Sequence, residues 1–522
     1  MILDARAIPP DTIVDTDICI VGAGAAGISM ARALSDSRFR VTLLESGGMQ
    51  FEAETQKLYE GQNIGLPYPD VTTDRLRFFG GTTNHRGRWC LPLDPIDFLP
   101  REDFPYHGWP FDRSALDPWY ARAQQVCQLG PYDYRPASWG IPASRIPQPF
   151  AGPDFTTKIL QPSGVFFGPA YAQELRTAPR VTVYLHANAF HFDAGDNDAE
   201  IKQLLVKTLS GNRFTIKSRC YVLAAGGIEN ARLLLASGTE AGPGLGNAHD
   251  LVGRFFMVHL AYEGGTIVPA DPRQDLDFRS KGQREIDGGR HSYFSYIGLS
   301  EAGMRTHHLQ NIFLYWGYKF SPVVDGVKAL ERLMDGEGPG GSRLHDLGEV
   351  ISHLEGVAEF AARKALFKQG IPIESMLVEC ASEQQPNPQS RITLGSRRDQ
   401  LGMRESVVDW QLLPEDKASA VATLRLLGTE IGRAGFGRFR SPLAEDGAWP
   451  ANFVGNDHHM GTTRMHVDPA QGVVDPNCRV HSVSNLYVAS SSVFPTGGAN
   501  NPTLTIVALA LRLADHLRTL LS

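Results

Sequence analysis

Residues 17–27 read Asp17-Ile18-Cys19-Ile20-Val21-Gly22-Ala23-Gly24-Ala25-Ala26-Gly27, a short apolar run that leads into three glycines. The run predicts a buried β-strand, and residues 28–34 predict the start of a helix after the glycine turn. A second predicted strand, residues 40–44, ends at Glu45. This arrangement is typical of a β-α-β unit that binds a dinucleotide, because glycines let backbone N–H groups approach a pyrophosphate at a helix N-terminus. Glu45 would then accept hydrogen bonds from the adenosine ribose.

The 522-residue chain has the composition of an ordinary globular protein, with 42% hydrophobic and 20% charged residues. This length predicts about two or three structural domains. The formal net charge of -7 gives nucleic-acid binding no electrostatic support. The 6 cysteines are too sparse for a disulfide scaffold, and none of them forms a C-x-x-C pair.

The sequence also bears on where the protein is found in the cell. No apolar stretch reaches the length of a membrane span. The residues after Met1 lack the basic-then-apolar pattern of a secretory signal. We therefore expect a cytoplasmic protein without a membrane span.

Further elements of the dinucleotide-binding part are spread along the chain. Residues 221–227 predict a second strand and turn, and residues 228–237 the helix after it. Residues 181–185 and 201–208 alternate like strands of a meander. The apolar spacing of residues 503–521 predicts a closing helix. A domain assembled from these segments is discontinuous in sequence.

The remaining segments have other patterns. Residues 96–175 are rich in Pro, Trp and Tyr, whereas 290–318 and 373–412 have strand-like patterns and 414–434 predicts a helix. Residues 322–370 are helical in pattern around a Gly-rich break. This last segment would be an inserted lid or a contact between subunits.

A second Gly-rich run, Phe78-Phe79-Gly80-Gly81-Thr82-Thr83-Asn84-His85, follows the first unit. Its glycines would let the backbone press against a planar ring or a phosphate. Asn84 and His85 would reach a flavin ring, or else be the polar side chains of a structural turn. Arg77 would face the pyrophosphate, or else form a surface salt bridge.

Two segments near the C-terminus carry the candidate chemistry. They read His458-His459-Met460-Gly461-Thr462-Thr463-Arg464-Met465 and Gly498-Ala499-Asn500-Asn501-Pro502-Thr503. A neutral His458 would take the proton of an alcohol while a flavin takes the hydride, and Asn501 would hold the substrate oxygen. His459 and His466 are rivals for this role, but each is interpreted mainly as structural. A metal site is not expected, because adjacent histidines in an extended segment point apart. A G-x-S-x-G elbow of serine hydrolases is absent.

These motifs resemble those of the glucose–methanol–choline (GMC) flavin oxidoreductases. The resemblance covers about residues 15–95, 180–265 and 375–522 and rests on five ordered motifs. They lie at residues 22–27, 80–85, 223–230, 458–465 and 497–505, and Asn485-Leu486-Tyr487-Val488-Ala489 is similar to the strand that leads to the flavin. Within the family, the chain is most similar to the pyranose oxidase and bacterial glycoside 3-oxidase branch.

The resemblance implies an α/β fold, α+β overall, with a Rossmann-like FAD-binding domain and a mainly antiparallel-sheet substrate domain. The FAD-binding domain would comprise residues 1–95, 180–265 and 455–522. The substrate-binding domain would comprise residues 96–179 and 266–454, with 322–370 as its helical insertion.

The resemblance also implies roles for individual residues. The catalytic His of the family falls on His458, and the partner position, His or Asn in the family, falls on Asn501. His85 matches the residue that carries a covalent flavin in fungal pyranose oxidases. The Arg86-Gly87-Arg88-Trp89 that follows departs from the aromatic residue usual there, so we expect non-covalent FAD.

The expected cofactor and substrate contacts are drawn from all of these motifs. The residues expected to bind FAD are Gly22, Ala23, Gly24, Ala26, Gly27, Glu45, Ser46, Arg77, Gly80, Gly81, Thr83, Asn84, His85, Ala189, Ala225, Gly226, Ser490, Asn501 and Thr503. The residues expected to bind substrate are Gln384, Gln385, His458 and Asn501. Gln384 and Gln385 belong to a segment similar to the family's substrate-domain segment near the sugar site.

The resemblance implies oxidation of a secondary ring hydroxyl of a sugar or glycoside to a ketone. O2 or another acceptor would then reoxidise the flavin. Three alternatives stay open: the large subunit of a sugar or polyol dehydrogenase with a cytochrome partner, an oxidase of a non-sugar alcohol, and a lyase that keeps FAD only structurally. The sequence leaves the oligomeric state open.

Overall fold

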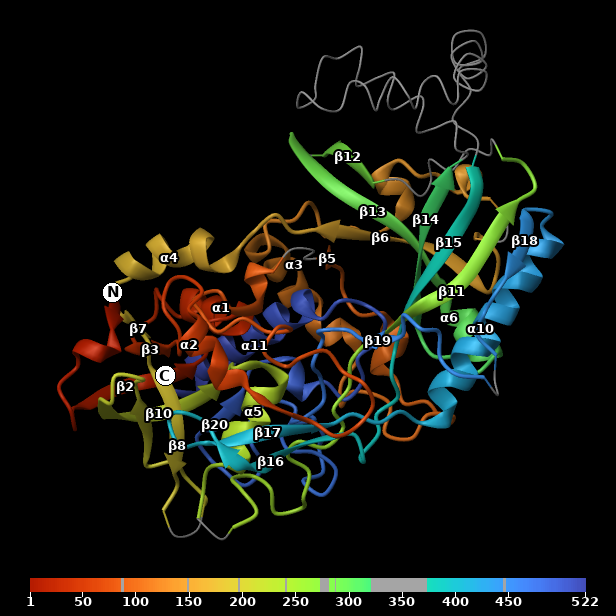
Figure 1. Cartoon of the computed structure of the whole chain (residues 1–522). Coiled ribbons are helices and arrows are strands. Elements are labelled where there is room, and N and C mark those ends of the chain that lie inside the picture. The colour runs from red at the N-terminus through yellow and green to blue at the C-terminus, as the bar shows by residue number, and fades with distance from the viewer. Residues whose placement is uncertain are drawn as a thin grey trace, which may run out of the picture.

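The computed structural model of the chain describes residues 1–85, 89–147, 150–195, 198–239, 242–272, 281–286, 288–320, 373–444 and 447–522. The insertion predicted at 322–370 therefore lies outside the described residues. An α/β lobe and a second, antiparallel sheet lie side by side, and both chain termini are on the α/β lobe (Figure 1).

The sheet of the α/β lobe has its strands in the order β1-β7-β3-β2-β10-β9-β8, and β20 also pairs with β10. Its parallel strands are β1 (Ile2–Asp4), β7 (Val181–Leu185), β3 (Val41–Leu44), β2 (Ile13–Val21), β10 (Arg213–Leu223) and β20 (Leu486–Val488). The antiparallel strands β9 (Gln203–Lys207) and β8 (Asn188–Asp193) extend one edge. Ile18, Cys19 and Ile20 of β2 are fully buried. Burial on both faces explains why the central strands read as continuous apolar runs.

Helices from distant parts of the chain cover this sheet. They are α1 (Ala25–Ala33), α2 (Ala53–Gln56), α3 (Asp117–Val126), α4 (Phe167–Thr177), α5 (Gly226–Leu235) and α11 (Thr503–Leu520). The C-terminal helix α11 packs against α1 and α3, so the C-terminal end of the chain belongs to the same lobe as the N-terminal end (Figure 1). The predicted closing helix is thus observed.

One strand of the lobe differs from its expected place. Residues 181–185 were expected to join 201–208 in a meander, but β7 pairs in parallel with β1 and β3. Its Val181 and Val183 are buried, which suits a position in the parallel sheet rather than in a half-exposed meander. The strand over 201–208 does form, as β9 between β8 and β10.

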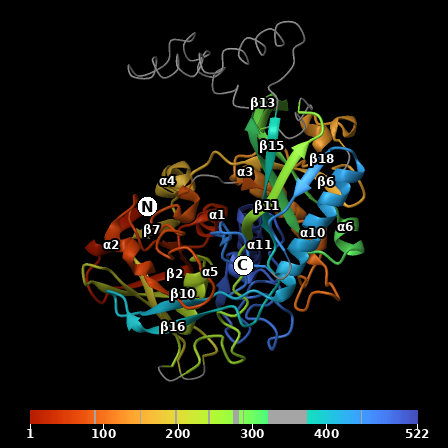
Figure 2. The same cartoon turned by 45° about the vertical axis from the view of Figure 1, so that its right-hand side comes forward.

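The second sheet is antiparallel, with the order β18-β11-β15-β14-β13-β6-β5, and β12 and β19 pair with β13 and β11. Its strands are β5 (Trp89–Cys90), β6 (Phe155–Pro162), β11 (Leu260–Pro269), β12 (Lys281–Ile286), β13 (Gly289–Leu299), β14 (Ile312–Phe320), β15 (Ile373–Ser382), β18 (Gly437–Arg440) and β19 (Val454–Gly455). The helices α6 (Glu301–Thr306) and α10 (Pro414–Arg433) accompany it. In both views α10 lies along the β18 side of this sheet (Figures 1 and 2).

A small third sheet joins β16 (Arg391–Arg398), β17 (Arg404–Asp409) and β4 (Gly61–Asn63). The β16–β17 pair packs on α5 of the α/β lobe, although the predicted boundaries put residues 391–409 in the substrate domain. The boundaries themselves stay a prediction. Short 3-10 helices complete the described elements: Ala5–Ala7, Lys57–Tyr59, Gly81–Asn84, Pro95–Phe98, Arg113–Leu116, Pro136–Trp139, Ala143–Arg145 and Ser491–Val493.

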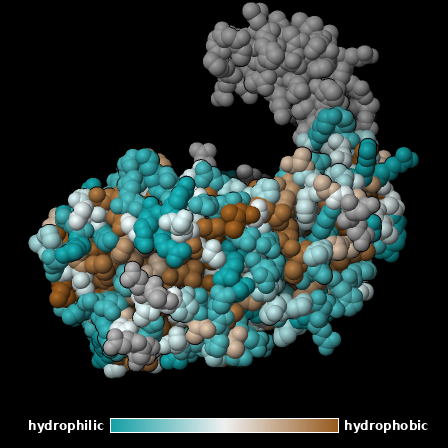
Figure 3. Space-filling model, turned by 60° about the horizontal axis from the view of Figure 1, so that its bottom comes forward, coloured by the Kyte–Doolittle hydropathy of each residue, from teal (hydrophilic) through white to brown (hydrophobic). Residues whose placement is uncertain are grey.

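The surface is of mixed polarity. On the face seen in Figure 3, hydrophilic residues surround scattered hydrophobic ones, a pattern common in globular proteins. Exposed large hydrophobic residues such as Ile13, Ile64 and Val467 come from separate parts of the chain. Among the helices of the described residues, none has the length and apolar character needed to cross a membrane.

Candidate active site

The first glycine turn follows β2. Two of its glycines allow close backbone packing, and the third lies beside open space. Gly22 has a φ of +106°, and a Cβ there would lie 2.6 Å from the carbonyl oxygen of Ala224. A Cβ on Gly27 would lie 1.9 Å from the carbonyl oxygen of Gly22, so these two glycines permit close backbone packing. A Cβ on Gly24 would meet nothing within 4 Å, and Gly24 lines a cavity. The turn therefore leaves an open cradle at the N-terminus of α1, where an anion is favoured.

Glu45 follows β3 and lies beside this cradle. Its carboxylate accepts hydrogen bonds from the backbone N–H groups of Ala23 and Gly47, each at 3.0 Å. Burial raises the pKa of this carboxyl group, although these hydrogen bonds and Arg77 oppose the rise. A buried acceptor at this place fits the hydroxyls of a ribose.

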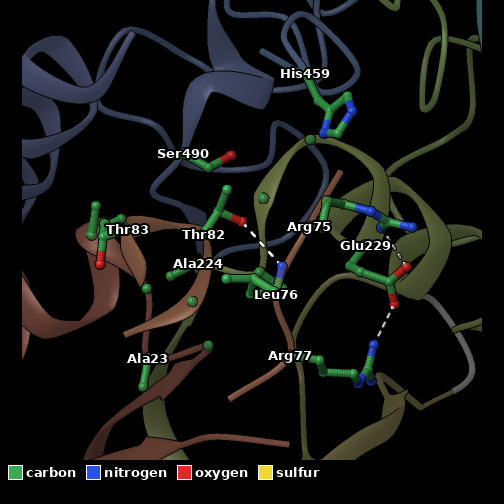
Figure 4. A pocket seen from close by; sticks show the side chains of 18 of the residues that line it. Ala23, Arg75, Leu76, Arg77, Thr82, Thr83, Ala224, Glu229, His459 and Ser490 are labelled. Atoms are coloured by element: carbon green, nitrogen blue, oxygen red, sulfur yellow. Dashed lines mark hydrogen bonds and ion pairs between the residues drawn. The ribbon is translucent and has the colours of Figure 1, made fainter. Parts of the chain in front are cut away.

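The cavity runs from the glycine turn to the two C-terminal segments. The expected cofactor residues that line it are Gly22, Ala23, Gly24, Ala26, Glu45, Ser46, Arg77, Gly81, Thr83, His85, Ala189, Ala225, Gly226, Ser490, Asn501 and Thr503. Three expected residues do not line it, namely Gly27, Gly80 and Asn84. Figure 4 shows the wall between Ala23 and Ser490, where Ala224 and Thr82 also lie.

The second Gly-rich run packs against the first. Gly80 and Gly81 have φ values of +100° and +53°, and a Cβ on Gly81 would lie 3.1 Å from the Cα of Gly24. Asn84 donates its amide hydrogens to the carbonyl oxygens of Phe79 and Gly81. Asn84 therefore holds the turn together, while Gly81 helps to form the cavity wall. His85 lines the same cavity.

Arg77 is held by a buried ion pair rather than a surface salt bridge. The carboxylate of Glu229 contacts Arg75 at 3.0 Å and Arg77 at 3.2 Å (Figure 4). Burial would raise the pKa of Glu229, but Arg232, Arg77 and Arg75 outweigh it and lower the pKa to about 2. The Nε of Arg77 is buried and has no hydrogen-bond partner within the described part of the chain. Other parts of the Arg77 residue line the cavity.

His458 and Asn501 meet at the far wall of the cavity. The Nε2 of His458 lies 3.2 Å from the amide nitrogen of Asn501, and both residues line the cavity. Burial, together with the neighbouring His259 and His459, holds the pKa of His458 well below the ordinary value of 6.5. A neutral imidazole with a hydrogen-bonding amide beside it is suited to accept a proton from an alcohol.

The segment that carries His458 is fixed by close backbone contacts. Met460 forms a bridge with Met257, and a Cβ on Gly461 would lie 2.1 Å from the carbonyl oxygen of Phe255. The Thr463 hydroxyl is 2.6 Å from the Ser492 hydroxyl. These contacts leave little freedom for the imidazole next to them.

The neighbouring polar residues are held by hydrogen bonds to other groups. His459 also lines the cavity, but its Nε2 lies 2.8 Å from the hydroxyl of Tyr68 and 3.0 Å from a carboxylate oxygen of Asp74. The side chain of Asn500 is buried and contacts the Tyr296 hydroxyl and a backbone carbonyl. His466 accepts a hydrogen bond from a backbone N–H two residues further on.

Gln384 and Gln385 lie behind the site rather than on its wall. Each is only 2% exposed, and neither lines the cavity. The Gln384 side chain accepts hydrogen bonds from Val258 and Trp410 and donates one to Gln411. The predicted contact of these glutamines with the substrate stays a prediction.

Two residues near the site carried no signal that marked them in the sequence. Trp89 lines the cavity and stacks on Phe313, with ring centroids 5.8 Å apart and planes 16° apart. His259 follows an apolar run, and its Nδ1 lies 2.9 Å from the Nδ1 of His458. An isolated histidine in an apolar run is ordinarily a core residue. Among the described residues, groups of three or more His, Cys, Asp or Glu that could hold a metal ion are absent.

Two families match separate parts of the chain. Residues 17–247 match the family described as FAD dependent oxidoreductase, and residues 386–510 match GMC oxidoreductase. The 6'''-hydroxyparomomycin C oxidase of Streptomyces lividus is 27% identical, over 96% of this chain and 92% of that protein. The fructose dehydrogenase large subunit of Gluconobacter japonicus is 23% identical, over 96% of this chain and 97% of its own length.

A shorter match and a solved structure add to this. The C-glycoside 3-oxidase of Arthrobacter globiformis is 50% identical, over 10% of this chain and 11% of that protein. The crystal structure of pyridoxine 4-oxidase superposes with a TM-score of 0.55 at 17% identity, covering 96% of this chain and 98% of that one. This likeness confirms the predicted fold class. The two matched families and the relatives that align along nearly the whole chain identify it as a member of the glucose–methanol–choline (GMC) family of FAD-dependent oxidoreductases.

Proposed function

We propose that this oxidoreductase converts a secondary ring hydroxyl of a sugar or glycoside to a ketone. The observation that carries the proposal is the pair His458 and Asn501, with nitrogens 3.2 Å apart on the wall of the cavity that the glycine turns open. FAD, when bound in this cavity, would supply the hydride acceptor. The rest of the chemistry belongs to the side chains around it.

His458 would act as the base. Its lowered pKa means that the imidazole is unprotonated at neutral pH, so Nε2 can accept the proton of the substrate hydroxyl. Asn501 would donate a hydrogen bond to the substrate oxygen and hold the hydroxyl in line with Nε2. Such alignment matters because proton transfer requires a heavy-atom separation of about 2.6–3.2 Å.

The residues present fit the cofactor. The turns at Gly24 and Gly81 leave a cradle for the diphosphate, and Glu45 offers a buried acceptor to the ribose. We propose that FAD is held without a covalent bond to His85. Acid precipitation tests this: a yellow supernatant is expected, whereas a yellow pellet would contradict it.

One aromatic side chain on the cavity wall supports a ring-shaped substrate. Trp89 lines the cavity and contacts Phe313, Phe294 and Tyr315, with centroid distances of 5.8, 5.8 and 6.2 Å. The flat ring of Trp89, held by these neighbours, suits the C–H face of a sugar ring. The name of the Arthrobacter globiformis relative, C-glycoside 3-oxidase, points to the same substrate class.

A dehydrogenase is the second candidate. The fructose dehydrogenase large subunit aligns along 96% of this chain, and its name implies further subunits. The acceptor would then be a cytochrome partner instead of O2. Comparing reoxidation of the reduced enzyme by O2 and by a soluble quinone decides between an oxidase and a dehydrogenase.

Anaerobic titration of the yellow protein tests the function. Monosaccharides, glycosides and non-sugar alcohols are added in turn while the flavin absorbance is followed. Bleaching by sugars or glycosides is expected, and a ketone on the ring should appear in equal amount. Bleaching by non-sugar alcohols alone would favour the oxidase of another alcohol, and no bleaching by any alcohol would favour a lyase.

His458→Ala provides the matched variant. We expect it to retain FAD but to reduce the flavin about 10²–10⁴-fold more slowly, because the base is missing. A variant that reduces its flavin at the wild-type rate would refute the role of His458. His191→Ala is the control, because the imidazole of His191 lies 3.2 Å from the carbonyl oxygen of Ala236 and His191 does not line the cavity.

The cytoplasm is the proposed compartment. All 6 cysteines are buried free thiols. Thiols persist in the reducing cytoplasm, whereas oxidising compartments favour disulfides.

A further inference from the structure

A second histidine lies directly behind the proposed base. His259 is 1% exposed and immediately precedes β11. Its backbone carbonyl accepts a hydrogen bond from the Asn456 N–H at 2.9 Å, which ties it to the segment that carries His458. The two imidazole rings have centroids 4.9 Å apart and planes 76° apart, and their Nδ1 atoms are 2.9 Å apart. This is a hydrogen bond between two like nitrogens.

One hydrogen bond between two Nδ1 atoms requires one N–H and one lone pair. In the first arrangement His458 carries its proton on Nδ1 and donates that hydrogen bond to His259, which leaves the Nε2 of His458 unprotonated. In the second arrangement His259 donates, and the proton of neutral His458 is on Nε2. Only the first arrangement presents a base to the cavity.

The groups in front of His458 favour the first arrangement. The amide nitrogen of Asn501 lies 3.2 Å from Nε2 of His458, and an amide nitrogen only donates. Nε2 must then be the acceptor. With a proton on Nε2, the N–H of His458 and the amide N–H of Asn501 would be two donors facing each other without an acceptor.

The negative charge of Glu383 behind His259 favours it too. In the first arrangement the proton of His259 is on its own Nε2, which is buried on the side of Gly497 and Gly498 and has no hydrogen-bond partner among the described residues. Glu383, held by the N–H of Gly498 at 3.1 Å, contributes a negative charge on this side. A negative charge attracts an N–H and repels a lone pair.

Burial keeps the pair uncharged at rest. It lowers the pKa of His259 to about 4, despite Glu383 and the backbone of Gly497 and Gly498. Burial lowers the pKa of His458 as well. Each ring therefore carries a single proton at neutral pH.

We propose that His259 is a positioning residue that accepts the Nδ1–H of His458 and so keeps the Nε2 of His458 free to act as the base. The inference rests on the proposed function. As the substrate O–H bond breaks, the hydroxyl proton would go to Nε2 of His458, and FAD, when bound, would supply the acceptor for the hydride of the neighbouring C–H bond. The Nδ1–H of the resulting imidazolium stays in its hydrogen bond to His259. A buried neutral acceptor orients the ring without adding a charge.

Two amide substitutions of His259 distinguish the proposed hydrogen-bond acceptor from a side chain that only fills space in the core. His259→Asn places an amide oxygen near the position of Nδ1, where it can accept from His458. His259→Gln places the amide near the position of Nε2, beyond the reach of His458. We expect flavin reduction about 10–100-fold slower in His259→Gln, with unchanged substrate affinity, and largely restored in His259→Asn. His191→Gln is the matched control.

A measurement without substrate gives an independent readout. Ring-nitrogen NMR of histidine-labelled holoenzyme reports which nitrogen of each imidazole is protonated, and His458→Ala identifies the His458 signals. We expect His458 in the wild type to be protonated at Nδ1. In His259→Gln we expect a mixture of tautomers.

The outcomes distinguish the two proposals. No bleaching of the wild type by any sugar or glycoside would end the proposed function, and an active His458→Ala would refute the role of His458 as the base. An inactive His458→Ala with equal rates in His259→Asn and His259→Gln, whether both slow or both normal, would overturn the role of His259 alone. A wild-type His458 protonated at Nε2 would overturn it whatever the substrate, even if both variants of His259 fail to fold.

Discussion

At the scale of the residue, the proposed chemistry depends on a neutral imidazole. His458 faces Asn501 at the cavity and His259 and His459 within the protein. The pKa of His458 lies below the ordinary 6.5, so the base form dominates above that pH and is lost only as the pH falls through the lowered value. The rate of flavin reduction should therefore be constant from pH 6.5 upward, with its acid limb at lower pH.

Asn501→Asp tests the same electrostatics. A carboxylate would replace an amide whose nitrogen lies 3.2 Å from Nε2 of His458, and it would stabilise the imidazolium. The acid limb of the rate of flavin reduction should then move to higher pH, as measured by anaerobic stopped flow. Asn501→Ala adds no charge and is the control, so its acid limb should stay in place. An acid limb that is the same in Asn501→Asp and in the wild type would mean that another group controls it.

At the scale of the element, the turn between β2 and α1 contains one glycine expected to matter for FAD binding and another expected to matter for stability. A Cβ on Gly24 would enter the cavity and meet no protein atom within 4 Å, whereas one on Gly27 would lie 1.9 Å from a backbone oxygen. Gly24→Val should therefore fold but lose FAD, as the ratio of flavin to protein absorbance would show. Gly27→Val should melt at a lower temperature than wild-type apoprotein by circular dichroism. Loss of FAD together with loss of stability in Gly24→Val would contradict this division.

The elements also show what the sequence could predict. The spacing of Gly22, Gly24 and Gly27 after an apolar run predicted the β2-turn-α1 unit, because close packing and anion binding both require those glycines. The strand over 181–185 was misplaced, because its apolar residues suit a parallel strand as well as a meander. The contact of His259 with His458 could not be predicted, because the two residues are 199 positions apart and only the fold joins them.

At the scale of the whole molecule, a buried ionic network joins segments that are distant in sequence. Glu229 of α5 contacts Arg75 and Arg77 from the N-terminal part of the chain. Arg232, also of α5, contacts Glu229 and reaches Asp399 between β16 and β17 at 2.7 Å. The network therefore fixes the third sheet and the wall of the cavity to the α/β lobe.

The pH dependence of stability should reveal this network. The pKa of Glu229 is lowered from 4.5 to about 2, so its stabilising contribution is complete above pH 4.5 and is lost as the pH falls toward 2. Glu229→Gln leaves buried arginines without their partner, and we expect it to lower the free energy of unfolding at pH 7 by about 3–5 kcal/mol. The free energy of unfolding of Glu229→Gln should depend less on pH between 4.5 and 2 than that of the wild type, as urea unfolding at several pH values would measure.

Asp4→Asn, which breaks the exposed pair with Arg6, is the control and should change stability by less than about 1 kcal/mol. Equal effects of the two substitutions would mean that the network does not hold the lobe together.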